Sequence, residues 1–575
     1  MPHRAHLFSL RIGHAVRESC LAEPYGRERL GRDLLAGLTV GIIAIPLAMA
    51  LAIASGVPPQ HGLYTAVIAG FLIALAGGSR FSVSGPTAAF VVILFPIAQQ
   101  YGLAGLLLAS VMAGLLLVGL ALLRLGRFIE YIPESVTLGF TGGIAVVIAT
   151  LQVKDLLGLS MGPMPEHFIA KLEALALALP GTHWPSLLVA CLTLAVLLLW
   201  PRLKTPIPPH LPAVAVGALV ALWLGQRGFA VDTIGSRFSY LLADGSLGRG
   251  IPPFAPHFEW PWRQPGPDGG QLGFSWQLLR DLVPAAFAIA MLGAIESLLC
   301  AVVLDGMTGK RHSANSELLG QGIGNIVAPF FGGITATAAI ARSAANVKAG
   351  AQSPMAAMIH ALVVLLGLVA LAPLLAHLPM AAMAALLLVV AWNMSEAPKA
   401  LHLLRTAPRG DLWVFATCFS LTVLLDMVIA ITAGILLAAV LFMREVAEMT
   451  RVAEVTDGRR LGGRPVPEGW SVFRVNGPLF FAAADRVFGE LAARIGARRG
   501  IILDLEGVSI IDAGGLSALT KLIAQCQRDG CRIRIAELQF QPLKTLARAG
   551  LKPIDGVLSF HPTLADALED LSGNS

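Results

Sequence analysis

Long runs of apolar residues follow one another along most of the chain. Several of these runs are shorter than the roughly 20 residues that a complete membrane-spanning helix needs. We therefore expect an α-helical polytopic membrane protein in which some spans are half-helices or helices lengthened by polar ends. The clearest runs cover residues 36–55, 62–76, 103–123, 136–151, 186–200, 212–224, 283–304, 355–375, 380–392, 412–425 and 427–443.

The apolar pattern ends at Arg444, and a different pattern follows. Residues 444–468 are charged and rich in Gly and Pro, which is typical of a linker. Beyond them, strand-like and helix-like segments alternate, which predicts a small α/β domain with a sheet covered by helices. The predicted strands are 471–475, 500–505 and 531–536, and the predicted amphipathic helix is 516–527. The predicted order of parts is an N-terminal segment at 1–32, a transmembrane domain at 33–443, the linker at 444–468 and the soluble domain at 469–575.

The composition agrees with a membrane environment. Of the 575 residues, 55% are hydrophobic and 14% are charged, whereas soluble domains carry about 25% charged residues. The 60 Gly and 36 Pro residues are tolerated in packed membrane helices. The formal charge of +6 indicates Lys and Arg next to the membrane rather than a nucleic-acid-binding surface.

Lys and Arg residues in the short connections predict the orientation. If the spans alternate, these connections and the basic N-terminal segment lie on one face, and the positive-inside rule makes that face cytoplasmic. A longer loop at residues 227–276 then lies on the opposite face. The cations are Arg4, Arg11, Arg17, Arg27, Arg29 and Arg32 in the N-terminal segment, and Arg124, Arg127, Arg202, Lys204, Lys310, Arg311, Lys399, Arg405 and Arg409 in the connections.

A weak internal repeat relates the two halves of the transmembrane domain. Asp33 opens the first apolar span, and Asp281 opens a later one. A segment rich in small and hydroxylated residues follows in each half, at residues 79–90 and 332–343. Interrupted segments at corresponding positions of two repeats point to the binding site of a transporter.

The first of these segments predicts a helix that begins inside the membrane. Pro86 suits the first turn of a helix, because its missing N–H is unpaired there in any case. Ser84 is then expected near the N-cap. The free N–H groups and the helix dipole at such a tip attract an anion. The alternative is an ordinary surface loop that caps a complete helix.

The second segment contains one cation, Arg342, after small and hydroxylated residues. An Arg at membrane depth is costly and usually faces a partner or an aqueous cavity. Its guanidinium group can bind a carboxylate in a bidentate manner. The alternatives are an Arg that extends to the cytoplasmic surface and one that is paired with an acid for structural reasons.

Two residues inside apolar spans are further candidates. Glu296 lies well within a span, where desolvation favours a protonated carboxyl group, so it can carry a proton. The alternative is a fixed hydrogen-bonding residue that never titrates. Pro46 removes a backbone hydrogen bond and is expected to kink its helix. The freed carbonyl groups then line the site, unless the kink serves packing alone.

Known catalytic and cofactor motifs do not occur in the sequence. There is no GxSxG, GxxxxGK[ST] or HExxH motif, each of which would place reactive or metal-binding groups together. The six cysteines form no CxxC pair, and the 13 histidines show no metal-ligand spacing. We therefore expect no enzymatic activity, no metal, no cofactor and no ATP-driven pumping.

The combined motifs resemble the sulfate permease (SulP) family of anion transporters, from about Asp33 onward. Within that family, residues 81–90 and 332–346 are most similar to a bacterial transporter of four-carbon dicarboxylates. The tail resembles the STAS domain of the family. The matching stretches are 33–56 with Pro46, 62–64, 81–88, 294–297 and 341–346, together with 503–504 and 511–514 in the tail.

The resemblance implies fourteen membrane segments in two inverted repeats of seven, with half-helices at 85–98 and 338–347. It also implies a core domain that moves against a gate domain in an elevator-like cycle, and a homodimer in the bacterial inner membrane with both termini in the cytoplasm. The chain departs from the pattern at Leu47, where many members have Gln. It also has Ala513 where anti-sigma-factor antagonists carry a phosphorylated Ser, which excludes phosphorylation at that position.

The residues and the resemblance together predict proton-coupled uptake of succinate, fumarate or a similar dicarboxylate such as aspartate. The alternatives are a sodium- or proton-coupled bicarbonate or sulfate transporter, a passive anion channel, a membrane-tethered signalling scaffold and a nucleobase carrier. The expected partners are the anion, a proton, the bilayer, a second copy of the chain and a cytoplasmic partner of the STAS domain, but no nucleic acid. The expected substrate-binding residues are Pro46, Ser84, Gly85, Thr87, Thr337, Ala338, Ala339 and Arg342, and Glu296 is the expected proton carrier.

Overall fold

The computed structural model describes most of the chain. The described residues are 10–126, 132–162, 164–165, 167–203, 205, 207–241, 246–267, 269–270, 272–425, 427–456, 461, 466–496 and 498–572. Three of the cations used to predict the orientation, Arg4, Arg127 and Lys204, lie outside the described residues. The chain divides into two compact units, Met1–Ile435 and Leu436–Ser575.

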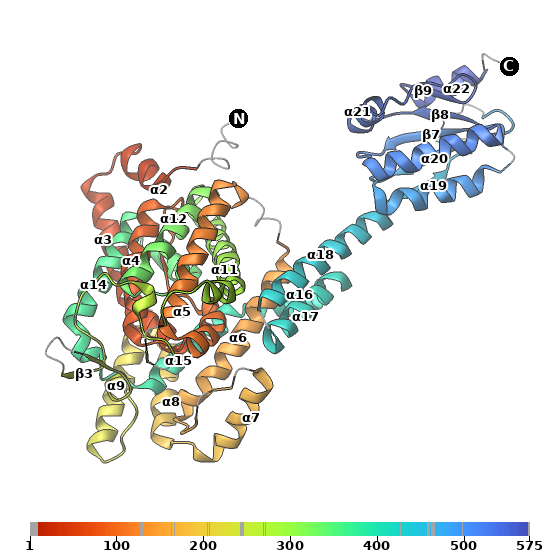
Figure 1. Ribbon diagram of the computed structural model, residues 1–575. Helices are drawn as coiled ribbons and strands as arrows, with labels where there is room; N and C mark the ends of the chain where they lie inside the picture. The colour runs from red at the N-terminus through yellow and green to blue at the C-terminus, as the bar shows by residue number, and fades with distance from the viewer. Residues whose placement is uncertain are drawn as a thin grey trace. The chain divides into compact units, whose positions relative to one another are not determined.

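The first unit is a bundle of helices (Figure 1). Among the described residues, 9 helices are long and apolar enough to cross a membrane. Each apolar run found in the sequence lies within a helix or close to its bounds, so the prediction of a polytopic helical protein is confirmed. The helices are α2 (His14–Val16), α3 (Arg27–Ala54), α4 (Pro59–Ala76), α5 (Ala88–Leu122), α6 (Glu134–Leu157), α7 (Phe168–Ala178), α8 (Trp184–Leu199), α9 (His210–Gln226), α10 (Ile234–Arg237), α11 (Trp276–Thr308), α12 (Ala314–Val327), α13 (Ile340–Lys348), α14 (Met355–Leu375), α15 (Met380–Met394), α16 (Ala397–Thr406), α17 (Arg409–Leu424) and α18 (Met427–Met449), the last of which continues into the second unit.

Helix α5 consists of two segments that meet at Gly102. The backbone of Gly102 has φ 66° and ψ −166°, a conformation that side chains disfavour. A Cβ atom there would lie 2.4 Å from the carbonyl carbon of Gly266. We count α5 as two segments and leave aside the short helices α2, α7, α10 and α16. The described part of the first half then has α3, α4, two segments of α5, α6, α8 and α9, and that of the second half has α11 to α15, α17 and α18. Each half thus contains seven segments, as the inverted repeat requires.

The helices of the first unit form two groups. In one group, α3, α4, α5, α11, α12 and α14 pack against one another, whereas in the other α6 packs against α15 and α17, and α8 packs against α9 and α15. Fewer contacts join the groups, mainly through α3, α5 and α15. This division matches the core and gate domains that the family resemblance implies.

The residues before α3 are bound to the first group of helices. The backbone N–H of Gly13 donates to the carbonyl of Ala76 at 2.8 Å. The guanidinium group of buried Arg80 donates to Glu23 at 2.8 Å, and this hydrogen bond lowers the pKa of the Glu23 carboxyl group. Within the first turns of α3, the Asp33 carboxylate also accepts from the Ser353 hydroxyl at 2.6 Å. These contacts fix the loops that lead into and out of the half-helices.

The second unit is a five-stranded sheet with helices on both faces. The strand order is β5-β6-β7-β8-β9, with β5 antiparallel to β6 and the other neighbours parallel. One face of the sheet packs against α19, α20 and α21, and the other against α22. The elements are β5 (Arg451–Glu454), β6 (Trp470–Asn476), α19 (Phe481–Ile495), β7 (Gly500–Gly507), α20 (Ala513–Asp529), β8 (Arg532–Ala536), α21 (Phe540–Arg548), β9 (Leu558–His561) and α22 (Leu564–Ser572).

The predicted strands and the predicted helix of this domain are confirmed. Part of the segment expected to be a linker is regular structure, because α18 continues to Met449 and β5 follows. Strand β5 was missed because four residues at the edge of a sheet give no clear alternating pattern. Buried Asp504 on β7 accepts a hydrogen bond from Arg474 on β6 at 2.6 Å, so this acidic residue ties two central strands together.

We expect Gly102→Ala to destabilise the transport unit. A side chain at this positive φ costs about 1–2 kcal/mol, and the new Cβ atom would also overlap the backbone of Gly266. Thermal unfolding of the purified protein, followed by tryptophan fluorescence, measures the effect as a lower Tm.

The matched control is Gly119→Ala, in the same helix, where a Cβ atom would meet nothing within 4 Å. Because Ala stabilises a helix interior by about 1 kcal/mol relative to Gly, this variant should keep or raise the Tm. Equal effects of the two substitutions would contradict the break at Gly102.

Candidate functional site

The two interrupted segments meet in a short antiparallel pair. Strand β1 (Ser84–Gly85) pairs with β4 (Thr337–Ala338), with Ser84 opposite Ala338 and Gly85 opposite Thr337. All four residues are buried. Helix α5 begins shortly after β1, and α13 begins shortly after β4. The structure therefore brings the N-termini of two helices to one place, as expected from the repeat. We call this place, formed by residues 84–88 and 337–342, the crossing.

The start of α5 differs from the prediction. The N-cap is Thr87, in an extended conformation, rather than Ser84, and Pro86 precedes the cap instead of occupying the first turn. The reason is that Ser84 and Gly85 are extended by their pairing with β4. The Ser84 hydroxyl therefore caps no helix and instead accepts a hydrogen bond from Gln321 at 3.1 Å.

The N-cap residue Thr87 is linked to Glu296. Its hydroxyl makes no capping hydrogen bond to α5 and instead donates to a carboxylate oxygen of Glu296 at 3.1 Å. Glu296 lies on α11 and is half-buried. The acidic residue predicted inside a span is thus in contact with the first half-helix.

Arg342 connects the second half-helix to the first. It lies in the first turn of α13, is 4% exposed, and donates from Nη2 to the carbonyl of Pro86 at 2.6 Å. Its other terminal nitrogen, Nη1, has no hydrogen-bond partner within the part of the chain that the structure describes. A Cβ atom on Gly85 would lie 2.8 Å from Nη1, so the absence of a side chain at Gly85 allows this close approach.

Arg342 and Glu296 do not form a direct ion pair. Their charges interact electrostatically, but none of the ion pairs recorded for the described residues joins them. The guanidinium group instead binds a backbone carbonyl, and the carboxylate instead accepts from a threonine. Neither charge neutralises the other by contact, which leaves both available to a ligand.

One turn of α11 holds both half-helices. Ser297, next to Glu296, shares a hydrogen bond with the Thr337 hydroxyl at 2.6 Å. The Thr337 hydroxyl also donates to the carbonyl of Gly293 at 3.1 Å. Thus Glu296 contacts the α5 side of the crossing, while Ser297 and Gly293 contact the β4 side.

Of the other predicted residues on this side, Ala338 is buried in β4 and Ala339 is the N-cap of α13. The Ala339 N–H is already occupied, since it donates to the carbonyl of Val83 at 3.1 Å. The Val83 N–H in turn donates to the Ser343 hydroxyl at 2.9 Å. The donors that remain for an anion are therefore those of the first turn of α13, which have no partner within the helix.

A buried polar stripe on α12 fixes the segment before the first half-helix. Glu317, Gln321 and Asn325 follow one another at helical spacing, and all three are buried. Glu317 accepts from the backbone N–H groups of Gly78 and Ser79, both at 2.9 Å, while Gln321 donates to Ser84.

The same stripe also holds the segment before the second half-helix. Asn325 accepts from the Ala336 N–H and donates to the Ala336 carbonyl, both at 2.8 Å. The equivalent helix of the first half, α4, contributes Thr65, which accepts from the Ile334 N–H at 2.7 Å, and His61, which lies 2.7 Å from the carbonyl of Gly332. Each half of the chain therefore holds the interrupted segment of the other half.

The apolar pattern of the sequence does not indicate this stripe. Residues 314–327 were not recognised as a membrane segment, because three buried polar side chains and several Gly residues weaken the apolar signal. The spacing of Glu317, Gln321 and Asn325 was the available signal, since polar residues at i, i+4 and i+8 share one helix face.

Pro46, the remaining predicted site residue, lies on a different helix from the two half-helices. It is buried in the middle of α3, which continues through it from Arg27 to Ala54. Helix α3 packs against α13, mainly through its first half, where Ala36 and Val40 lie among residues of α13 and of the segment after it. Its part in substrate binding stays a prediction.

In the soluble unit, the Asp512–Ala513 loop has a structural role. Asp512 is the N-cap of α20, and its carboxylate accepts from the Gly515 N–H at 2.7 Å and from the Phe481 N–H at 3.1 Å. In both units, the described residues contain no group of three or more His, Cys, Asp or Glu residues that could hold a metal ion.

Comparison with known proteins agrees with this arrangement. The sulfate permease family matches residues 30–418, and the STAS domain matches residues 464–567. A Bacillus subtilis protein named "Putative sulfate transporter YvdB" is 40% identical over 92% of this chain and 95% of its own length. The "Bicarbonate transporter BicA" of Picosynechococcus is 27% identical over 86% of each chain.

Solved structures show the same fold. The structure of SLC26A9 superposes with a TM-score of 0.81 at 20% identity, covering 100% of this chain and 94% of that one. The transmembrane domain of a cyanobacterial BicA superposes with a TM-score of 0.60 at 29% identity, covering 71% of this chain and 98% of that one. The chain therefore belongs to the sulfate permease family of membrane anion transporters and carries a C-terminal STAS domain.

Proposed function

We propose that the protein imports four-carbon dicarboxylates, such as succinate, fumarate or aspartate, together with protons. The anion lies between the N-termini of α5 and α13, and the crossing moves with the core helices in an elevator-like cycle. The protein acts as a homodimer in the bacterial inner membrane, with both termini in the cytoplasm and a cytoplasmic partner bound to the STAS domain.

The single observation that carries the proposal is the environment of Arg342 Nη1. This buried donor has no partner among the described residues and lies beside Gly85, close to the starts of both half-helices. A buried cationic donor without a partner is costly, and a carboxylate oxygen of the substrate would remove that cost. The expected donors to the anion are Arg342 and the N–H groups of the first turns of α5 and α13. Ser84, Gly85, Thr87, Thr337, Ala338 and Ala339 are expected to line the site, and Pro46 is a further predicted binding residue.

The charges around the crossing favour a dianion with a proton. Each helix N-terminus contributes a positive charge equivalent to about half an elementary charge, and Arg342 contributes one more. Together they amount to about two positive charges, which balance a dicarboxylate. An ionised Glu296 beside the site would repel that dianion, whereas a protonated Glu296 would not. Binding of the substrate and of a proton at Glu296 would therefore favour each other.

The positive charge at the crossing would also suit the alternative anions. Sulfate is also a dianion, and relatives are named as sulfate or bicarbonate transporters, so the charge balance does not select the carbon skeleton. The resemblance of residues 81–90 and 332–346 to a dicarboxylate transporter supports succinate. A passive channel of the same fold would not accumulate substrate against a gradient, and a signalling scaffold or a nucleobase carrier would leave the cationic crossing without a use.

Uptake of labelled succinate into proteoliposomes tests the function. We expect an inwardly directed proton gradient to drive accumulation above the external concentration, and an imposed sodium gradient to add nothing. Sulfate and bicarbonate serve as competing substrates in the same assay. A sodium requirement, or no uptake of any dicarboxylate, would overturn the proposal.

We expect Glu296→Gln to abolish acceleration of uptake by external acid while succinate still binds. The amide keeps the hydrogen bond to Thr87 but carries no titrating proton. Succinate binding is measured by calorimetry on purified protein, and uptake is measured across a range of external pH. If the pH dependence persists in the variant, another group carries the proton.

We expect Arg342→Gln to weaken succinate binding at least about tenfold, because a hydrogen bond to a charged group contributes about 1.5–3 kcal/mol. The matched control is Lys348→Gln on the same helix, which removes an exposed cation and should leave affinity unchanged. Equal losses in the two variants would indicate a general charge effect and would contradict a direct contact between Arg342 and the anion.

A further inference from the structure

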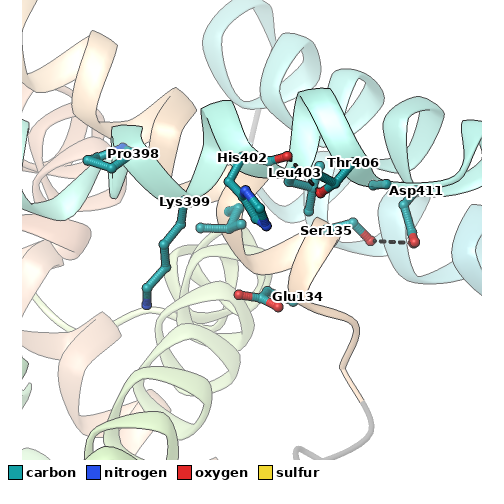
Figure 2. Close-up of a pocket in the computed structure, with 10 residues that line it drawn as sticks. Glu134, Ser135, Pro398, Lys399, His402, Leu403, Thr406 and Asp411 are labelled. Atoms are coloured by element: carbon teal, nitrogen blue, oxygen red, sulfur yellow. Dashed lines mark hydrogen bonds between the residues drawn. The ribbon is translucent and has the colours of Figure 1, made fainter.

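A cavity lies in the other group of helices, away from the crossing. It has a volume of about 500 Å³, within the range of small-ligand sites. Its walls come from the start of α6, from α16 and from the start of α17, and none of the residues of the crossing lines it. Figure 2 shows Lys399 and His402 extending from α16 toward the side on which Glu134 of α6 lies.

Helix α16 faces this cavity with its polar side. Lys399, His402 and Thr406 line the cavity together with the apolar Pro398 and Leu403. On the other side of the helix, Leu401 and Leu404 are each 48% exposed. An amphipathic helix in water turns its apolar side inward. The opposite arrangement, with apolar residues outward, is that of a helix whose surroundings are lipid.

Residues at both ends of α16 indicate that it lies at the membrane surface. Trp392 precedes the helix and Trp413 follows it, and each is 67% exposed. Exposed Trp residues are enriched where hydrocarbon meets the lipid headgroups. Arg405 and Arg409 are exposed beside them, as expected on the cytoplasmic face. The cavity therefore opens at headgroup depth, next to an apolar surface that acyl chains can cover.

The cavity carries charges of both signs. Lys399 and His402 lie on one wall, and Glu134 and Asp411 on the other. Lys399 is paired with Glu396, and Asp411 accepts a hydrogen bond from Ser135 at 3.2 Å. The Glu134 carboxylate interacts electrostatically with Lys399 across the cavity, but none of the side-chain hydrogen bonds or ion pairs found in the described ranges involves this carboxylate or the His402 ring. A ligand with a negative and a positive group would satisfy both walls.

We propose that this cavity binds the headgroup of a phosphatidylethanolamine molecule from the inner leaflet. The phosphate lies against Lys399 and His402, the primary ammonium donates to Glu134 and Asp411, and the acyl chains run over Leu401 and Leu404. Phosphatidylglycerol carries the phosphate but no ammonium group, so its binding would leave the acidic wall without a cation. The quaternary ammonium of phosphatidylcholine has no N–H to donate, so it would bind more weakly.

Native mass spectrometry of the delipidated full-length protein tests the proposal. Equimolar phosphatidylethanolamine, phosphatidylglycerol and phosphatidylcholine are added, and the bound lipid is counted for each. We expect phosphatidylethanolamine to be retained preferentially. Glu134→Gln should lower its retention about tenfold, and Lys399→Gln should do the same. Such a loss corresponds to about 1.4 kcal/mol.

Arg405→Gln is the matched control, since Arg405 is an exposed cation on the same helix that does not line the cavity. This variant should bind phosphatidylethanolamine like the parent protein, and size-exclusion profiles show that all variants are folded. Equal retention of phosphatidylglycerol, or retention that does not respond to Glu134→Gln and Lys399→Gln, would overturn the proposal. If these variants instead change the monomer–dimer ratio and not lipid binding, a second copy of the chain covers the cavity, which also overturns it.

Discussion

The antiparallel pairing of Ser84–Gly85 with Thr337–Ala338 is the constraint on which the transport unit depends. Backbone that leaves helical geometry at membrane depth must find its hydrogen-bond partners inside the protein, because lipid offers none. Here each interrupted segment is paired with the other, and polar side chains of α4 and α12 bind the residues that precede the pair. The cost of breaking two helices is thus offset within the core.

This pairing also creates the site. Two helices begin beside it, so their unpaired N–H groups and positive dipole ends lie close together. Arg342 reaches from one half-helix to the carbonyl before the other, and α11 places Glu296 and Ser297 on opposite sides of the crossing. Because these contacts lie within one group of helices, the site can move as a unit against the second group. The cavity beside α16 belongs to that second group, so a lipid bound there, as proposed, would act away from the crossing.

The buried polar residues around the crossing differ in how completely their hydrogen-bonding groups are paired. Glu317 accepts from two backbone N–H groups and from the Gln321 side chain, and Asn325 is bonded to backbone groups, so both act as structural supports. Arg342 retains one donor without a partner among the described residues, and Glu296 is only half-buried. Fully satisfied groups make the scaffold rigid. The unpaired donor of Arg342 is cationic, so a bound anion would supply its missing interaction.

The sequence by itself determined the class of the protein, the positions of most helices, the two interrupted segments, and Arg342 and Glu296 as unusual charges. These features are local: apolar runs, small-residue segments and ionisable residues within spans can be recognised without knowing their neighbours. Only the tertiary structure decided where α5 begins, that Thr87 contacts Glu296, and that Glu317, Gln321 and Asn325 support the crossing. Those facts depend on contacts between distant segments, such as Arg342 and the carbonyl of Pro86, which are 256 residues apart. Local propensity favoured a helix starting at Pro86. The helix begins at Ala88 instead, because the pairing of β1 with β4 keeps Ser84 and Gly85 extended.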